Sequence, residues 1–112
     1  MKQIRINKIE SLILRAMGEI LIEKKDFLTG NNIVSVTFVK VTPDLSIAKI
    51  YLSIFPVEKR EEILSYFETN KKYIRKLLGQ KIRNIRKIPE LQFFIDDSFD
   101  QIQRMDELLK DD

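Results

Sequence analysis

The 112-residue sequence contains no cysteine, no histidine and no tryptophan, and only three glycines. Without cysteine there is no disulfide framework, no thiolate nucleophile and no cysteine-ligated zinc site. Without histidine there is no imidazole base, no Ser-His-Asp triad and no histidine-ligated metal. The glycines form neither a G-x-G-x-x-G nor a Walker phosphate loop. We therefore expect a protein that is not an enzyme, with no cofactor, no metal and no small-molecule substrate.

Long apolar runs are also missing. The apolar N-terminal stretch is interrupted by charges at Arg5, Glu10, Arg15 and Glu19. No segment approaches the roughly 18–20 apolar residues that span a bilayer. Hydrophobic residues at 44% and charged residues at 33% are typical of a soluble globular protein. We expect a single domain over residues 1–112, a cytoplasmic location and no membrane partner.

The first half of the sequence predicts a helix followed by a β-hairpin. Apolar residues recur every three or four positions and predict a helix over residues 4–23. Residues 29–32 (Thr-Gly-Asn-Asn) then break the chain. Two β-branched runs, residues 33–41 and 46–55, are separated by a Thr-Pro-Asp turn and predict two antiparallel strands.

After Pro56 the pattern returns to helices and then to one more strand. A short helix is expected through Phe67, and a further helix with an apolar stripe over residues 74–78 is expected to end only at Pro89. Alternating apolar residues at 91–95 predict a last strand. The segment Ser98-Phe99-Asp100-Gln101 fits a capping box that opens a final acidic helix to about Lys110.

Alternation along the predicted hairpin assigns each strand an apolar and a polar face. On the first strand we expect Val34, Val36 and Phe38 to share the covered face. On the second strand Ala48, Ile50, Leu52 and Ile54 share it. The opposite face carries Ser35, Thr37, Lys49, Tyr51 and Ser53, so one side of the sheet is expected to be open to water.

Two aromatic residues are expected on this open face. Tyr51 and Phe94 there could serve as platforms on which bases stack. Isolated aromatics on a sheet face more often pack against a terminal segment, here the final helix.

Charge is distributed very unevenly along the second half of the chain. Residues 71–87 hold eight cations and no acid, whereas residues 90–112 hold eight acids and two cations. A one-sided row of cations on a helix is typical of contacts with a phosphate backbone, although many charged helix faces are only solvated. Lys81 falls outside the expected arc. The candidate RNA-binding residues are Lys71, Lys72, Arg75, Lys76, Arg83, Arg86 and Lys87.

The acids after the last strand have two interpretations. Asp96, Asp97 and Asp100 could gather a hard cation such as Mg²⁺ and support a small hydrolytic or RNA-modifying enzyme. The same acids are explained by charge complementarity with the N-terminus of the final helix. We favour the second interpretation.

Three segments in order resemble one protein family. Residues 44–53 (DLSIAKIYLS) resemble the D-L-x-x-A-K-[VI]-Y-[VIL]-S hairpin segment of ribosome-binding factor A. Residues 74–79 (IRKLLG) resemble its I-R-x-x-L-G segment. Residues 86–96 (RKIPELQFFID) resemble its R-x-x-P-E-L-x-F-x-x-D segment. Together with the amphipathic first helix, the resemblance covers nearly the whole chain.

The resemblance implies an α+β, type II KH-like fold in the order helix–strand–strand–helix–helix–strand, followed here by a C-terminal helix. It implies a bacterial factor that binds the small (30S) ribosomal subunit, assists maturation of the 5′ end of 16S rRNA and supports growth in the cold. The family has an Ala-x-Gly interhelical kink in place of the G-x-x-G loop of ordinary KH domains. Here the kink position is expected at Asn70, since Asn tolerates unusual backbone angles.

The sequence also departs from the family pattern, and alternatives remain open. The family's D-P-R segment after the first helix is replaced by Lys25-Asp26-Phe27-Leu28. A general RNA-binding KH-like module or a protein–protein interaction module without RNA would fit the same pattern. No unpaired apolar helix face is evident, so a monomer is expected.

Overall fold

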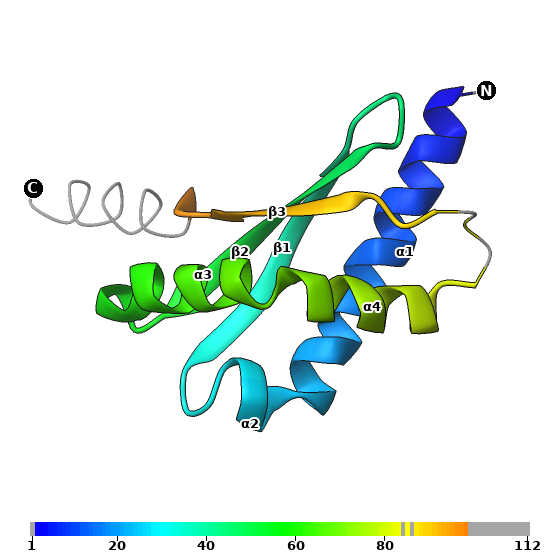
Figure 1. Cartoon of the computed structure of the whole chain (residues 1–112). Coiled ribbons are helices and arrows are strands. Elements are labelled where there is room, and N and C mark those ends of the chain that lie inside the picture. The colour runs from blue at the N-terminus through cyan, green and yellow to red at the C-terminus, as the bar shows by residue number, and fades with distance from the viewer. Residues whose placement is uncertain (1, 84, 86, 99–112) are drawn as a thin grey trace, which may run out of the picture.

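A computed structural model of the chain describes residues 2–83, 85 and 87–98. The expected helix beyond Ser98 therefore lies outside the described residues. The helices are α1 (Lys2–Glu23), α2 (Lys25–Leu28), α3 (Arg60–Thr69) and α4 (Lys71–Lys81), with a 3-10 turn η1 (Val57–Lys59) before α3. The strands are β1 (Ile33–Val41), β2 (Ile47–Phe55) and β3 (Glu90–Ile95) (Figure 1). The predicted order helix–strand–strand–helix–helix–strand is confirmed over this part of the chain, and the short elements α2 and η1 add to it.

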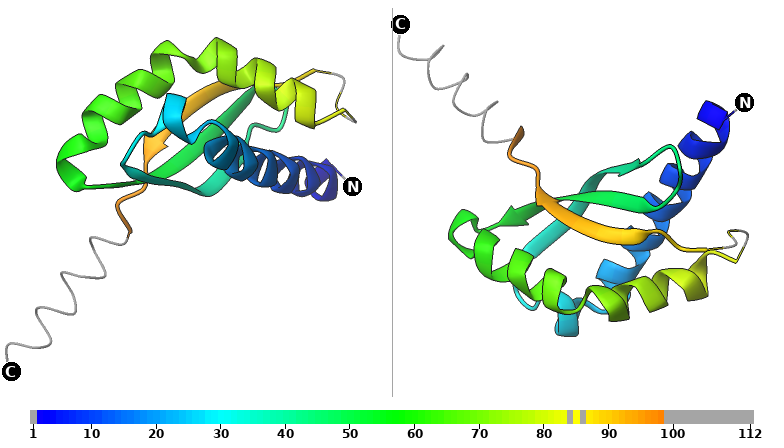
Figure 2. Two further views of the ribbon diagram at one scale, coloured as in Figure 1. Left: turned by 90° about the horizontal axis from the view of Figure 1, so that it is seen from below. Right: turned by 45° about the horizontal axis from the view of Figure 1, so that its top comes forward.

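The three strands form one mixed sheet in the order β1-β2-β3. β1 pairs with β2 in antiparallel fashion, and β2 pairs with β3 in parallel. Helices α1, α3 and α4 lie together on one side of this sheet, as the view from below in Figure 2 shows. The architecture is a two-layer α+β fold whose second sheet face carries no helix among the described residues.

The core lies between the sheet and the helices. The predicted stripe of α1 is buried, with Ile13, Met17 and Ile20 at most 1% exposed. Periodicity therefore predicted the packed face of this helix correctly. The side chains of β2 that face the helices are fully buried, and so is Phe67 of α3, whose ring meets Phe93 of β3 edge-on at 5.4 Å between centroids.

The predicted inward face of β1 is wrong beyond Val36. A β-bulge shifts the register between Val36 and Phe38, because Val36 pairs with Leu52 and Phe38 already pairs with Tyr51. One extra residue in a strand moves every later side chain to the other face. Phe38 is consequently 51% exposed on the open face, and Val39 takes the buried position at 4%.

Two further features differ from the sequence expectation. The family's D-P-R position folds as the short helix α2, which anchors Leu28 in the core at 2% exposure. Helix α4 ends at Lys81 instead of continuing to Pro89. The next residue, Ile82, adopts an extended backbone and is buried in the core at 6% exposure, so the chain leaves the helix there. Arg83 and Lys87 therefore do not lie on the helix.

No helix in the described part of the chain is long and apolar enough to cross a membrane.

Candidate nucleic-acid interface

A basic groove of about 540 Å³ lies between the start of α4, the start of β2 and the segment that leads into β3. Four of the predicted RNA-binding residues line it: Lys71, Lys72, Arg75 and Lys87. The remaining lining comes from Ser46, Ile47, Glu90 and Leu91. The fold thus brings together cations that are up to sixteen positions apart in the sequence. It places them beside the start of β2, a neighbour that the charge pattern of the sequence did not indicate. We call this set of eight residues the basic groove.

Helix α4 presents its lysines outward because its apolar side is fixed in the core. Ile74 and Leu78 are fully buried. Lys72 and Lys76, one turn apart on the exposed side, have no acid within ion-pair distance in the described part of the chain. Lys71 lies 3.5 Å from Glu68, an exposed pair of small energetic value. Lys76 extends the positive surface of α4 beyond the groove itself.

Arg75 has a structural role in addition to its charge. Its Nε donates hydrogen bonds to the carbonyl oxygens of Ile88 and Pro89, both at 3.1 Å, and its Nη2 donates to Ile88 as well. These bonds attach the segment before β3 to α4 and so form one wall of the basic groove. Sequence periodicity could not indicate this role, because it depends on contacts 13 and 14 residues along the chain.

Replacing Arg75 with glutamine should lower the free energy of unfolding by about 1–3 kcal/mol, because two backbone carbonyls lose a charged donor. Urea denaturation followed by far-ultraviolet circular dichroism measures this change. The matched control is Lys76→Gln on the exposed side of the same helix, which should stay within about 0.5 kcal/mol of the wild type. Equal stability of both variants would contradict the anchoring role.

The other predicted cations lie elsewhere. Arg83 is exposed beyond the end of α4, and Arg86 lies outside the described residues. Lys81, which the helical arc excluded, donates to Glu23 at 2.8 Å and to Glu19 at 3.3 Å. The hydrogen bond to Glu23 is the main reason why the pKa of Lys81 is raised. Lys81 therefore fastens α4 to α1.

Asn70 lies at the junction of α3 and α4, where the family kink is expected. Its backbone has φ −102° and ψ 15°, so no left-handed conformation is needed. The side-chain amide donates to the carbonyl of Tyr66 at 2.9 Å, and the carbonyl of Asn70 accepts from the N–H of Ile74 at 3.0 Å. Asn70 thus bonds to the last turn of α3 and the first turn of α4, adjacent to Lys71 and Lys72.

The hairpin turn beside the basic groove is ordered by Asp44. One carboxylate oxygen accepts from the hydroxyls of Ser46 at 2.7 Å and Thr42 at 2.8 Å, and from the backbone N–H of Ser46 at 3.1 Å. These bonds, that of the Ser46 hydroxyl first, lower the pKa of Asp44. Leu45 between them has φ 62°. The network holds Ser46 in place at the edge of the groove.

The acids after β3 do not form a metal site among the described residues, where no group of three or more ligating side chains is found. Asp96 instead accepts from the hydroxyl of Thr37 at 2.6 Å and from the backbone N–H of Ser98 at 3.0 Å. Asp100 and the expected capping partner Gln101 lie outside the described residues. Asp96 therefore ties the bulge of β1 to the end of β3.

The tie at Asp96 should make stability depend on pH in the acid range. Hydrogen bonds, with that of Ser98 first and that of Thr37 second, hold the pKa of Asp96 below its ordinary value of 3.8. A carboxylate with a lowered folded-state pKa stabilises the fold above its unfolded pKa, and this contribution disappears as the pH falls through the folded value. Asp96→Asn should therefore be less stable than the wild type at pH 7, and the difference should shrink as the pH falls below 3.8. A difference that is constant with pH would contradict this assignment.

Two aromatic groups on the surface complete the candidate sites. Tyr51 and Phe94 lie on the open sheet face, as expected, and the bulge adds Phe38 to them. A second group, which the sequence did not indicate, joins Phe27 of α2 to Tyr66 and Tyr73, with centroids 5.8 and 5.4 Å apart. The sequence indicated this second group only through Phe27, which lies in the segment that replaces the family's D-P-R pattern.

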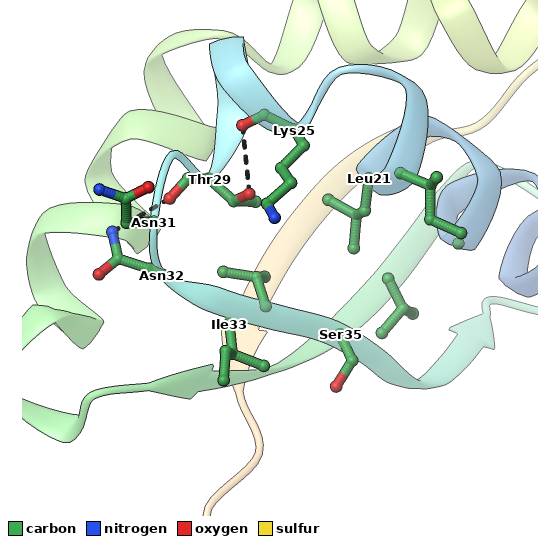
Figure 3. A pocket seen from close by; sticks show the side chains of 11 residues that line it. Leu21, Lys25, Thr29, Asn31, Asn32, Ile33 and Ser35 are labelled. Atoms are coloured by element: carbon green, nitrogen blue, oxygen red, sulfur yellow. Dashed lines mark hydrogen bonds between the residues drawn. The ribbon is translucent and has the colours of Figure 1, made fainter.

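A different hollow of about 600 Å³ lies between the end of α1 and the edge strand β1 (Figure 3). Its walls include Leu21, Ile33 and Val34, and Lys25 is the cation in its lining. Such an apolar surface does not suit a phosphate backbone, so the basic groove is the better nucleic-acid site.

Comparison with known proteins decides the family. A family model for ribosome-binding factor A matches residues 5–109. Ribosome-binding factor A of Cytophaga hutchinsonii is 42% identical over 110 residues, covering 97% of this chain and 83% of the relative. That of Chlorobaculum parvum is 43% identical over 109 residues, covering 96% and 89%. The chain belongs to the ribosome-binding factor A family.

Solved structures of the family share the fold. The crystal structure of ribosome-binding factor A from Thermus thermophilus superposes with a TM-score of 0.68 at 21% identity, covering 80% of this chain and 94% of that one. A homology model of the Thermus thermophilus factor, fitted into a cryo-electron microscopy map of a 30S complex, gives a TM-score of 0.64 at 21% identity, covering 80% and 93%. The predicted KH-like α+β fold is confirmed. The ribosome-binding factor A family consists of binding factors and not of enzymes.

Proposed function

We propose that this chain binds the small ribosomal subunit during its assembly and contacts 16S rRNA through the basic groove. The observation that carries the proposal is the convergence of four cations from α4 and the segment before β3 on one groove. Family membership supports it, and a homology model of a relative has been fitted into a map of a 30S complex. Action in the cytoplasm, as one domain and as a monomer, belongs to the same proposal.

Recognition in this groove would be electrostatic and would depend on shape. Lysine amines on α4 neutralise phosphates and release counterions, which provides affinity without reading bases. The fixed hairpin turn at Asp44 and the wall held by Arg75 set the width of the groove. Contacts of this kind position a protein on folded RNA, while base pairing within the RNA supplies the sequence.

The mechanism we infer is conformational. By binding one arrangement of precursor rRNA better than another, the chain shifts the population of the subunit toward that arrangement. Release follows when maturation removes the favoured arrangement. Assistance to processing of the 16S 5′ end, and a requirement for growth in the cold where misfolded RNA is longer-lived, are the expected consequences.

Sedimentation of the tagged full chain with ribosomal fractions tests this function. We expect it to migrate with free small subunits and not with translating ribosomes, and to be released as salt rises. A chain that stays at the top of the gradient at both low and raised salt would overturn the proposal. Salt-insensitive migration with a protein after RNA digestion would overturn it in favour of a protein–protein module.

A further inference from the structure

Three aromatic rings form a continuous row across the open face of the sheet, one from each strand. The centroid of Tyr51 lies 5.5 Å from that of Phe38 and 5.3 Å from that of Phe94, and the planes of Tyr51 and Phe94 are inclined by only 25°. The strand register sets Tyr51 directly between the other two. Phe38 is 51% exposed and Phe94 is 37% exposed. We call these three residues the ring row.

A positive row of side chains lies beside the rings. Lys40 pairs directly with Lys49 across β1 and β2, and Lys49 pairs with Gln92 of β3. Like charges directly opposite one another destabilise a sheet. Among the described residues no acid lies within ion-pair distance of either lysine. This pair is therefore uncompensated within the described residues, and an anion next to the ring row would relieve the repulsion.

The opposite side of the ring row carries a carboxylate, which does not favour anions there. There the hydroxyl of Thr37 donates to the carboxylate of Asp96 at 2.6 Å, across β2. This tie also holds the bulge that turns Phe38 to the open face. A polyanion on this surface would therefore place its anionic groups beside Lys40 and Lys49 and its planar groups over the ring row.

We propose that the open sheet face binds a short single-stranded segment of RNA, with unpaired bases stacked on the ring row and phosphates at Lys40 and Lys49. Aromatic rings beside a positive row form the usual surface for single-stranded nucleic acid. An apolar row alone would suit a protein equally, and the lysine pair favours RNA. The inference rests on the proposed rRNA-binding function and adds a second surface, on the face of the sheet away from α3 and α4 (Figure 2).

Binding of a labelled polyuridine RNA of about ten nucleotides to the full chain, measured by fluorescence anisotropy, tests the inference. The double variant Phe38→Ser/Phe94→Ser should bind at least about tenfold more weakly, since stacking on each ring is lost. Lys40→Glu/Lys49→Glu should also weaken binding and lower its salt dependence. The control is Phe27→Ser, which removes a ring of similar exposure, 48%, from α2, where it contacts Tyr66 and Tyr73 and not the open sheet face. Urea denaturation verifies that each variant is folded.

Loss of polyuridine binding in the ring-row and lysine variants, with the control unchanged, would support the inference. Equal binding of polyuridine by the wild type and the ring-row variant would overturn the inference. The ring row would then have another occupant, either a protein or the chain's own C-terminal residues. Absence of polyuridine binding by the wild type would overturn the inference as well. The proposed function fails separately, through loss of sedimentation with small subunits, so the two failures are distinguishable.

Discussion

Replacing Lys72 and Lys76 with glutamate should weaken binding to small ribosomal subunits by about 10- to 100-fold at low salt. Both side chains are exposed on the same side of α4, and neither is used in an ion pair with another described residue. Reversal of their charge replaces attraction to phosphates by repulsion. Because two phosphate contacts are lost, the slope of the logarithm of affinity against that of salt should also fall by about two.

The matched control is Lys25→Glu/Lys59→Glu, which changes the net charge by the same amount. These lysines are exposed on α2 and η1 and do not line the basic groove. Filter binding of labelled variants to purified small subunits measures both pairs. If the two double variants lose the same affinity, binding depends on net charge alone and the assignment to α4 is wrong.

Replacing Phe67 with alanine should lower the free energy of unfolding by about 3–5 kcal/mol. The ring is fully buried between α3 and β3 and meets Phe93 edge-on at 5.4 Å. Its removal leaves a cavity where α3 meets the sheet. Since small domains are typically stable by about 5–15 kcal/mol, this variant should be close to unfolding at physiological temperature.

Urea denaturation at 25 °C measures this loss for the full chain. Phe67→Leu should cost clearly less, because it keeps most of the buried volume. Phe55→Ala, with a 38% exposed ring, should cost about 1 kcal/mol or less. A loss below about 1 kcal/mol for Phe67→Ala would mean that α3 does not depend on this contact.

Patterns with a regular period were predictable from the sequence. The stripe of α1 and the alternation of β2 correctly indicated their buried faces, because burial on one side repeats with the period of the helix or strand. The position of Phe38 was not predictable in this way. A bulge inserts one residue into the alternation of β1, and no residue in that segment marks it in the sequence.

The basic groove was predictable in its charge but not in its shape. Eight cations without an acid are visible in the sequence. Lys87 lines the same groove as Lys71 and Lys72 because α4 ends early and because Arg75 forms hydrogen bonds to Ile88 and Pro89. These are contacts between distant residues, which local periodicity does not contain. The ring row likewise depends on strand register and not on spacing within one strand.

The salt dependence of binding to purified small subunits tests the central claim most directly. If the basic groove and the adjacent Lys76 together engage about four phosphates, the logarithm of the association constant should fall with that of the salt concentration with a slope of about −3 to −4. The Lys72→Glu/Lys76→Glu variant should give a slope of about −1 to −2 in the same titration. A slope near zero for the wild type, with tight binding retained, would contradict recognition of rRNA through this groove.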